Sequence, residues 1–196
     1  QSLTMIILSK TCRQIHDLMK EGYYIKRISV NFSVLDIRGK DFCSNVRKII
    51  DSNKIPREKV AIEITESQND KDFYMMKEKI EDLQESGIKF YLDDFGTGRS
   101  NLDYFVEMPV EIIKFDYSFT QGYFVSKKAK YVMESVIEMM HKMGLEIVSE
   151  GVETREQFEA MTALGVEYIQ GFYFSKPIPV KQFEAKYLTN RYAESV

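Results

Sequence analysis

Two adjacent carboxylates, Asp93 and Asp94, are the residues of this 196-residue chain whose type and spacing point most directly to chemistry. They follow the apolar run 88–92, which predicts a buried strand, and they precede a loop that contains Gly96 and Gly98. Neighbouring acids repel each other unless a cation or a proton lies between them. A solvated turn is the alternative, because Asp and Gly are common turn residues.

Similar polar side chains follow other apolar runs, at the predicted carboxyl ends of strands. They are Asn31, Glu63, Glu66, Lys114, Asp116, Glu150, Glu153 and Gln170. Oxygen ligands without Cys or His favour Mg²⁺ or Mn²⁺ over Zn²⁺. Several carboxylates around one lysine suggest two cations, which could clamp the attacking and leaving oxygens of a phosphodiester. The pattern therefore predicts a metal-dependent phosphoryl hydrolase or a lyase.

The strand predicted over residues 60–65 separates two of these acids. Glu63 and Thr65 lie on one face, whereas Glu66 points the other way or already belongs to the loop. Glu63 is therefore the better candidate ligand and Glu66 the better loop anchor. A plain solvated acid is the alternative for Glu66, because most exposed acids have no specific role.

These side chains need a scaffold, and the sequence predicts alternating helices and strands. Strands are expected at 27–33, 60–65, 88–92, 110–115, 145–149 and 166–170, and helices at 3–19, 42–53, 73–86, 102–105, 129–143, 156–164 and 180–188. This alternation is typical of parallel crossover units in one α/β domain. A (β/α)₈ barrel, in which all strand ends meet on one face, has eight strands. Six are visible, and we expect the other two to precede Gln1.

An open doubly wound sheet would also accommodate six strands, but no GxGxxG motif follows the first strand. This absence argues against a dinucleotide-binding fold.

The composition of the chain argues against several classes of partner and location. The net charge is -3 and the basic residues are scattered, so no nucleic acid polymer is expected as a partner. Cys12 and Cys43 lie far apart without neighbouring histidines, which favours free thiols in a reducing, cytoplasmic compartment. No apolar run reaches the roughly 18–20 residues of a membrane span.

Six short motifs then occur in order along the chain. They are VNFS at 30–33, EITE at 63–66, DDFGTG at 93–98, IKFD at 113–116, EGVET at 150–154 and QGF at 170–172. Together they resemble the motifs of the EAL-domain family of cyclic di-GMP phosphodiesterases. The resemblance implies a modified (β/α)₈ barrel, incomplete at its N-terminus, over residues 1–196. It also implies hydrolysis of cyclic di-GMP to linear pGpG with two Mg²⁺ or Mn²⁺ ions.

The resemblance further assigns roles to individual residues. Metal ligands are expected at Asn31, Glu63, Asp93, Asp94 and Glu150, with Asp93 placed to bridge the two ions. Glu150 would otherwise activate water, and Lys114 would position that water or stabilise the phosphate charge. Contacts to the substrate or to the loop after Asp94 are expected from Glu66, Asp116, Glu153 and Gln170, although a salt bridge is an equal alternative for Glu153.

The chain also departs from the family pattern. The Glu-Ala-Leu signature and its neighbouring arginine are absent, Arg99 replaces a usual aromatic, and Tyr117 replaces a common arginine. The family places the signature upstream of the first helix, so we expect the native protein to contain it; a protein that truly lacks those strands is the alternative. We expect this chain alone to hydrolyse cyclic di-GMP poorly, which full turnover by the 196-residue chain would contradict.

The resemblance also suggests partners. We expect a homodimer, and an upstream GGDEF or sensor domain in a full-length protein that could be membrane-anchored. Three alternatives to the phosphodiesterase stay open: a cyclic di-GMP receptor without turnover, an unrelated Mg²⁺-dependent barrel such as a lyase, and an interaction scaffold. The carboxylates expected downstream of residue 1 are all present, which favours the enzyme over the receptor.

Overall fold

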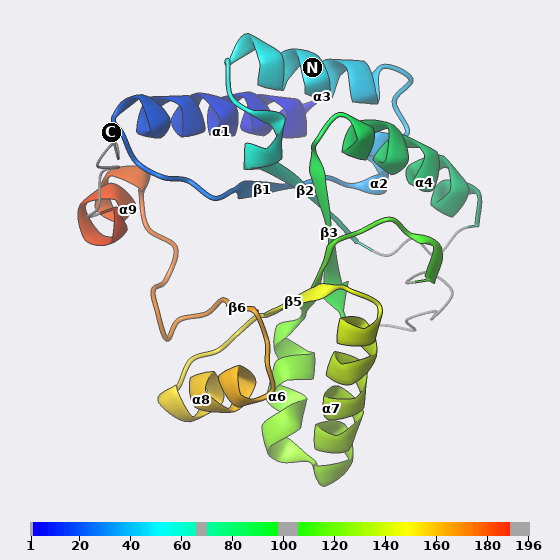
Figure 1. Ribbon diagram of the computed structural model, residues 1–196, viewed down its shortest axis with the longest axis vertical. Coiled ribbons are helices and arrows are strands. Elements are labelled where there is room, and N and C mark those ends of the chain that lie inside the picture. The colour runs from blue at the N-terminus through cyan, green and yellow to red at the C-terminus, as the bar shows by residue number, and fades with distance from the viewer. Residues whose placement is uncertain (1, 66–69, 98–105, 189–196) are drawn as a thin grey trace. The chain divides into compact units, whose positions relative to one another are not determined.

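The computed structural model describes residues 2–65, 70–97 and 106–188 and has an α/β fold, as the sequence predicts. Six strands follow one another in the sheet in the order of the sequence, β1-β2-β3-β4-β5-β6. The chain divides into two compact units, one of residues 1–63, 69–89 and 177–196, the other of residues 64–68 and 90–176. Figure 1 shows the elements of each unit.

The first unit carries the two N-terminal strands and most of the long helices. Its elements are α1 (Leu3–Lys20), β1 (Ile28–Asn31), α2 (Val34–Ile37), α3 (Phe42–Ser52), the 3₁₀ turn η1 (Arg57–Lys59), β2 (Val60–Thr65), α4 (Asp70–Glu85) and α9 (Val180–Tyr187). β1 and β2 pair in parallel, from Ile28 opposite Val60 to Asn31 opposite Glu63. This pairing places the polar ends of both strands at the same edge.

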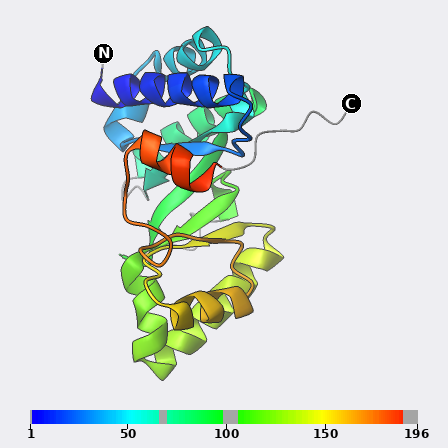
Figure 2. The ribbon, with the colours of Figure 1, turned by 90° about the vertical axis from the view of Figure 1, so that its left-hand side faces the viewer.

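The core of the first unit forms where α1 packs on α3 and β1. Leu8, Cys12 and Ile15 recur at helical spacing on α1 and are completely buried, as are Val46 and Ile50 on α3. The Ser2 hydroxyl caps α1 by accepting a hydrogen bond from the Met5 amide. α9 lies beside α1 (Figure 2), joined by a 3.2 Å hydrogen bond from Gln14 to Glu184.

The second unit carries the remaining strands and their crossover helices. Its elements are β3 (Lys89–Phe95), β4 (Ile112–Phe115), α6 (Tyr117–Val125), α7 (Lys127–Lys142), β5 (Glu146–Ser149), α8 (Arg155–Ala163) and β6 (Tyr168–Ile169). β3, β4, β5 and β6 pair in parallel in that order. α6 and α7 pack against each other and α7 also packs against β5, so the unit is built from β-α-β crossovers.

All six predicted strands are confirmed, although their limits differ. β3 extends through both acids to Phe95, where the sequence predicts a turn, and β6 is only two residues long. α2 and α6 were not predicted: α2 has four residues, and α6 has apolar residues on all sides and so lacks a helical period. The helix expected at 102–105 falls outside the described residues. In the part of the chain that is described, no helix combines the length and the apolar character needed to cross a membrane.

Candidate functional site

Asp93 owes its position to a bulge in β3. Leu92 pairs with Ile113 and Phe95 pairs with Phe115, so β3 has one more residue than β4 between these two positions. Asp94 takes up the extra length with a φ of 60°, a left-handed conformation that Asp tolerates better than most residues. The bulge interrupts the alternation of the strand, and Leu92 and Asp93 are both buried. A β-bulge of this kind can re-aim a side chain, and here the side chain is a carboxylate.

Lys114 of β4 joins Asp93 to a second acid. Its Nζ atom lies 2.9 Å from Oδ1 of Asp93 and 2.7 Å from Oε1 of Glu150. The residue is only 6% exposed. Burying a charge is costly unless it is paired, and the ammonium group meets that requirement with two carboxylates. One positive charge is thus surrounded by two negative charges, so the cluster carries a net negative charge.

The backbone around Glu150 fixes the geometry of this cluster. The Glu150 amide donates a 3.0 Å hydrogen bond to the carbonyl of Phe115, which continues the β4–β5 pairing beyond the strand end. On the other side, the Gln170 amide donates to Ser149 and the Val152 amide donates to Gln170. Glu150 is therefore held at the carboxyl ends of β4, β5 and β6, where the sequence places it.

Asp93 itself offers an oxygen that a cation could use. Its Oδ1 atom accepts the Lys114 ammonium and, at 3.0 Å, the backbone amide of Asp94. Within the described residues its Oδ2 atom accepts no hydrogen bond. A buried carboxylate oxygen that accepts no hydrogen bond from these residues suits a hard divalent cation. The donor chemistry therefore fits Mg²⁺ or Mn²⁺, although across the described ranges no three His, Cys, Asp or Glu side chains gather as a closed metal site.

The Asp116 carboxylate has a structural role as a helix cap. Its Oδ1 atom accepts hydrogen bonds from the backbone amide of Ser118 at 2.7 Å and from the Ser118 hydroxyl at 2.5 Å. Asp116 is thereby the N-cap of α6, the helix that directly follows the Lys114 strand. Its carboxylate therefore positions α6, and the predicted contact to a substrate or loop has no support in these bonds.

Aromatic packing ties α6 to the two strands that carry Asp93 and Lys114. Phe119 lies 5.4 Å from Phe95 and 5.1 Å from Phe115 between ring centroids, edge to face in both cases. Gly96 has a φ of 99°, and a Cβ atom there would lie 2.7 Å from the Cβ of Phe119. Only glycine lets Phe119 approach this closely, so the turn after Asp94 is fixed by packing.

Gln170 and Glu153, the other candidates in the second unit, lie near strand ends, and the hydrogen bonds described for them involve the backbone. Gln170 is exposed and contributes its backbone amide and carbonyl to the β5–β6 edge. Glu153 is exposed, and its amide donates to the Gln157 side chain at 2.7 Å. Among the described residues the Glu153 carboxylate forms no ion pair, so the salt-bridge alternative finds no support there. Glu66 lies outside the described residues.

Asn31 and Glu63 belong to the first unit. They are register partners at the ends of β1 and β2, and the Phe32 amide donates a 2.9 Å hydrogen bond to the Glu63 carbonyl. Glu63 is buried and Asn31 is exposed. The pairing of β1 and β2 thus sets the two residues predicted as ligands opposite each other at the strand ends.

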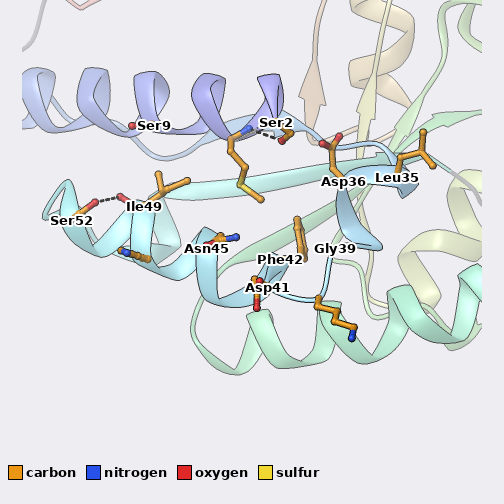
Figure 3. A pocket seen from close by; sticks show the side chains of 13 residues that line it. Ser2, Ser9, Leu35, Asp36, Gly39, Asp41, Phe42, Asn45, Ile49 and Ser52 are labelled. Atoms are coloured by element: carbon orange, nitrogen blue, oxygen red, sulfur yellow. Dashed lines mark hydrogen bonds between the residues drawn. The ribbon is translucent and has the colours of Figure 1, made fainter.

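A separate hollow of about 690 Å³ lies in the first unit, between the start of α1, α2 and α3 (Figure 3). The residues that line it include the apolar Met5, Phe42 and Ile49 and the basic Lys40 and Lys48. Asp36 also lines the hollow, but its carboxylate already accepts hydrogen bonds from the hydroxyls of Thr4 and Ser33. The hollow contains none of the strand-end residues predicted for chemistry. We therefore place the candidate site at the cluster formed by Lys114, Asp93 and Glu150, called the Lys114 cluster below.

Sequence reasoning did not find the residues that support Glu150 from α6. Thr120 and Ser149 are completely buried, with their hydroxyl oxygens 3.0 Å apart. Gln121 of α6 and Gln157 of α8 also bond to the loop after Glu150. The available signal was the Thr154-x-x-Gln157 spacing, which is typical of a capping box and is confirmed at the start of α8.

Comparisons with known proteins agree with these motifs. The family model described as EAL domain matches residues 1–177. Signaling protein YkoW of Bacillus subtilis is 31% identical over 178 residues, 91% of this chain and 22% of YkoW. Cyclic di-GMP phosphodiesterase PdeL of Escherichia coli is 34% identical over 146 residues, 74% of this chain and 40% of PdeL. The chain thus spans well under two thirds of these curated relatives.

The fold also matches a solved structure. The PaMucR phosphodiesterase in its c-di-GMP complex, from Pseudomonas aeruginosa, has 29% sequence identity and a TM-score of 0.85. The match covers 91% of this chain and 72% of that chain. This likeness confirms the predicted fold class, an α/β fold of the TIM-barrel type.

Proposed function

The chain belongs to the EAL-domain family, as its motifs predict, and on this basis we propose that the full-length protein hydrolyses cyclic di-GMP to linear pGpG. The observation that carries the proposal is the Lys114 cluster. A buried ammonium group that contacts Asp93 and Glu150 places a fixed positive charge and two carboxylates at adjacent strand ends. The names of PdeL and PaMucR, both phosphodiesterases, support the same activity.

Two residues of the cluster have separate roles in this proposal. Hydrolysis adds one water across a phosphodiester: the water oxygen bonds to phosphorus, and the released ribose oxygen takes up a proton. Glu150 orients the water and accepts its proton as the phosphorus–oxygen bond forms. Lys114 holds the Glu150 carboxylate in place and offsets the negative charge that develops on the phosphate. Neither role requires a change in the observed contacts.

Divalent cations complete the proposed site, and two Mg²⁺ or Mn²⁺ ions are expected. Asp93, through its Oδ2 atom, and Asp94 would hold a cation in the second unit, whereas Glu150 is a ligand only in the alternative in which it does not activate the water. When bound, the ions supply a more acidic water and neutralise phosphate charge. Asn31 and Glu63 remain predicted ligands in the first unit. Metal binding can be measured without activity: Mg²⁺ should raise the melting temperature of the wild-type protein and have little effect on Asp93→Asn.

The activity is tested by incubating the purified full-length protein with cyclic di-GMP and Mg²⁺ and separating the nucleotides by chromatography. The proposal predicts pGpG as the product, and its formation should stop when the metal is chelated. Tight binding of cyclic di-GMP without any product would identify the receptor that the sequence left open. Turnover of carboxylate substrates, with none of cyclic dinucleotides, would identify a lyase.

We also propose that the protein is a homodimer, because apolar side chains are exposed on α6 and α7. Val125 is 85% exposed and Tyr131 is 65% exposed, next to Val132. An association surface would cover these apolar side chains. Val125→Lys should convert a dimer to a monomer in light scattering. An unchanged mass would contradict the role of this surface.

The length of the relatives bears on the partner domains. The chain spans 22% of YkoW, which supports a further GGDEF or sensor domain in the full-length protein. A cytoplasmic location of the domain is part of the same proposal. Cell fractionation of the full-length protein, followed by protease access from each side of the membrane, tests that location.

A further inference from the structure

The loop after Glu150 is clamped by a relay of two glutamine side chains. Gln121 Nε2 donates a 3.0 Å hydrogen bond to the carbonyl of Gly151, and Gln157 Nε2 donates at 2.9 Å to Gln121 Oε1. Gln157 Oε1 in turn accepts the amides of Glu153 at 2.7 Å and Thr154 at 3.1 Å. The relay begins and ends on the same loop and passes through α6 and α8.

Each amide in the relay is used in a specific direction. The Gly151 carbonyl needs a donor, and the Gln157 amide nitrogen needs an acceptor, so Gln121 must present its nitrogen to one and its oxygen to the other. A carboxylate of the same shape at position 121 could accept from Gln157 but could not donate to Gly151. The relay therefore depends on an amide at this position and not only on the volume of the side chain.

Two further contacts join α6 to the residues on either side of Glu150. Gly151 has a φ of 72°, and a Cβ atom there would lie 2.2 Å from Cδ2 of Tyr117, so the ring of Tyr117 packs directly on the loop. The buried Thr120 and Ser149 hydroxyls lie 3.0 Å apart one residue before Glu150. Tyr117, Thr120 and Gln121 all lie on α6, so this helix contacts the side chain of Ser149 and the backbone of Gly151, on both sides of Glu150.

We propose that Gln121 is a positioning residue, which holds the Gly151 carbonyl so that the Glu150 carboxylate keeps its contact with Lys114. The proposal rests on the proposed phosphodiesterase function. Without the bond from Gln121, the Gly151–Val152 peptide keeps its bond from the Val152 amide to the Gln170 carbonyl but loses the anchor on its own carbonyl. The loop can then shift, and the Glu150 carboxylate no longer keeps its 2.7 Å contact with the ammonium group. Gln121 touches no reacting atom, so its loss slows turnover without weakening substrate binding.

The test compares Gln121→Met and Gln121→Glu with wild type in the full-length protein. Both variants should lower kcat about tenfold, about 1.4 kcal/mol of barrier, and leave KM within about twofold. Gln182→Met, which changes an exposed glutamine on α9, is the matched control and should retain wild-type kcat. A kcat per folded molecule within twofold of wild type in both Gln121 variants would overturn the proposal, because a merely structural role lowers only the folded fraction.

A second measurement separates this proposal from the proposed function. Hydrogen exchange of the amides in residues 150–154 should be faster in Gln121→Met, because Gln157 loses its partner and releases the amides of Glu153 and Thr154. Faster exchange supports the relay even if the wild-type protein does not hydrolyse cyclic di-GMP, which would contradict the proposed function alone. Unchanged exchange overturns the relay whatever the activity.

Discussion

Lys114 and Glu150 come from neighbouring strand ends and meet with 2.7 Å between Nζ and Oε1. The contact depends on two backbone features: the β4–β5 register, which sets Lys114 opposite Val148, and the Glu150 amide bond to Phe115. Lys114 also contacts Asp93, so the ammonium group on β4 offsets the carboxylate charges at the ends of both β3 and β5. This residue is therefore central to the stability of the cluster and, in the proposed function, to activity.

Lys114→Met should be strongly destabilising as well as inactive. It leaves two carboxylates near each other without the ammonium group, and removing one partner of a buried ion pair costs about 3 kcal/mol or more. Urea unfolding followed by circular dichroism measures that cost. We expect the folded fraction to lose at least a hundredfold in kcat, because the charge that offsets the phosphate is gone.

Lys142→Met is the control for this substitution. Lys142 lies 2.6 Å from Glu138, but both side chains are largely exposed, so solvent screens the pair. No measurable change in stability or activity is expected. If the free energy of unfolding of Lys114→Met equals that of this control, the buried cluster does not stabilise the fold.

The sequence predicted the positions of Asp93, Lys114 and Glu150, because the strand-end pattern depends on local composition. All three lie at or next to the carboxyl ends of strands in the second unit. The bulge at Asp94 was not predicted, because it arises from a mismatch between β3 and β4 that neither strand shows alone. The expected turn there is instead a strand that continues to Phe95.

Helix α6 was missed for a related reason. It carries apolar residues on all sides, mixed with polar ones, and it contains Gly122, so no helical period marks it. Tertiary packing stabilises it: Phe119 lies against Phe95 and Phe115. The role of Gln121 depends on partners 30 and 36 residues away in sequence, at Gly151 and Gln157, and no local pattern encodes such contacts.

Gly171→Ala should disturb the Glu150 loop. A Cβ atom at position 171 would lie 2.0 Å from the carbonyl oxygen of Val152, so the backbone must move. We expect a loss of about 3 kcal/mol in the free energy of unfolding and a lower kcat. Thermal unfolding and steady-state kinetics measure the two effects.

Gly144→Ala is the matched control for the effect of adding a methyl group. Gly144 has a φ of 77°, but a Cβ atom there would meet nothing within 4 Å. Its cost is limited to the left-handed conformation, about 1 kcal/mol, and kcat should not change. Equal effects of the two substitutions would show that the contact between Gly171 and Val152 is unimportant.

The two cysteines should react slowly with thiol reagents while the protein is folded. Burial raises the pKa of Cys12 to about 12 and, as the main cause, the pKa of Cys43 to about 11, from an ordinary value of 9.0. Both thiols therefore stay protonated at pH 8, and the thiolate is the reactive form. Absorbance with a chromogenic disulfide should show little reaction until guanidinium is added. Rapid labelling of folded protein would contradict this burial.

The same pKa values predict how stability depends on pH. The folded chain binds these two thiol protons more tightly than the unfolded chain does. Their contribution is complete below pH 9 and is lost as the pH rises through about 11 and then about 12. The free energy of unfolding should therefore fall in alkaline solution, and Cys12→Ala should reduce that fall. A pH dependence that is identical in the variant would contradict the assignment.

The proposed role of Asp93 as a ligand of the catalytic cation is tested most directly by Asp93→Asn in the full-length protein. The substitution keeps the shape of the side chain and removes its charge. Rates of pGpG formation are measured with saturating cyclic di-GMP across a Mg²⁺ titration, with circular dichroism to confirm folding. We predict a loss of kcat well above tenfold that added Mg²⁺ does not restore. A loss below about tenfold, or 1.4 kcal/mol of barrier, would contradict the claim.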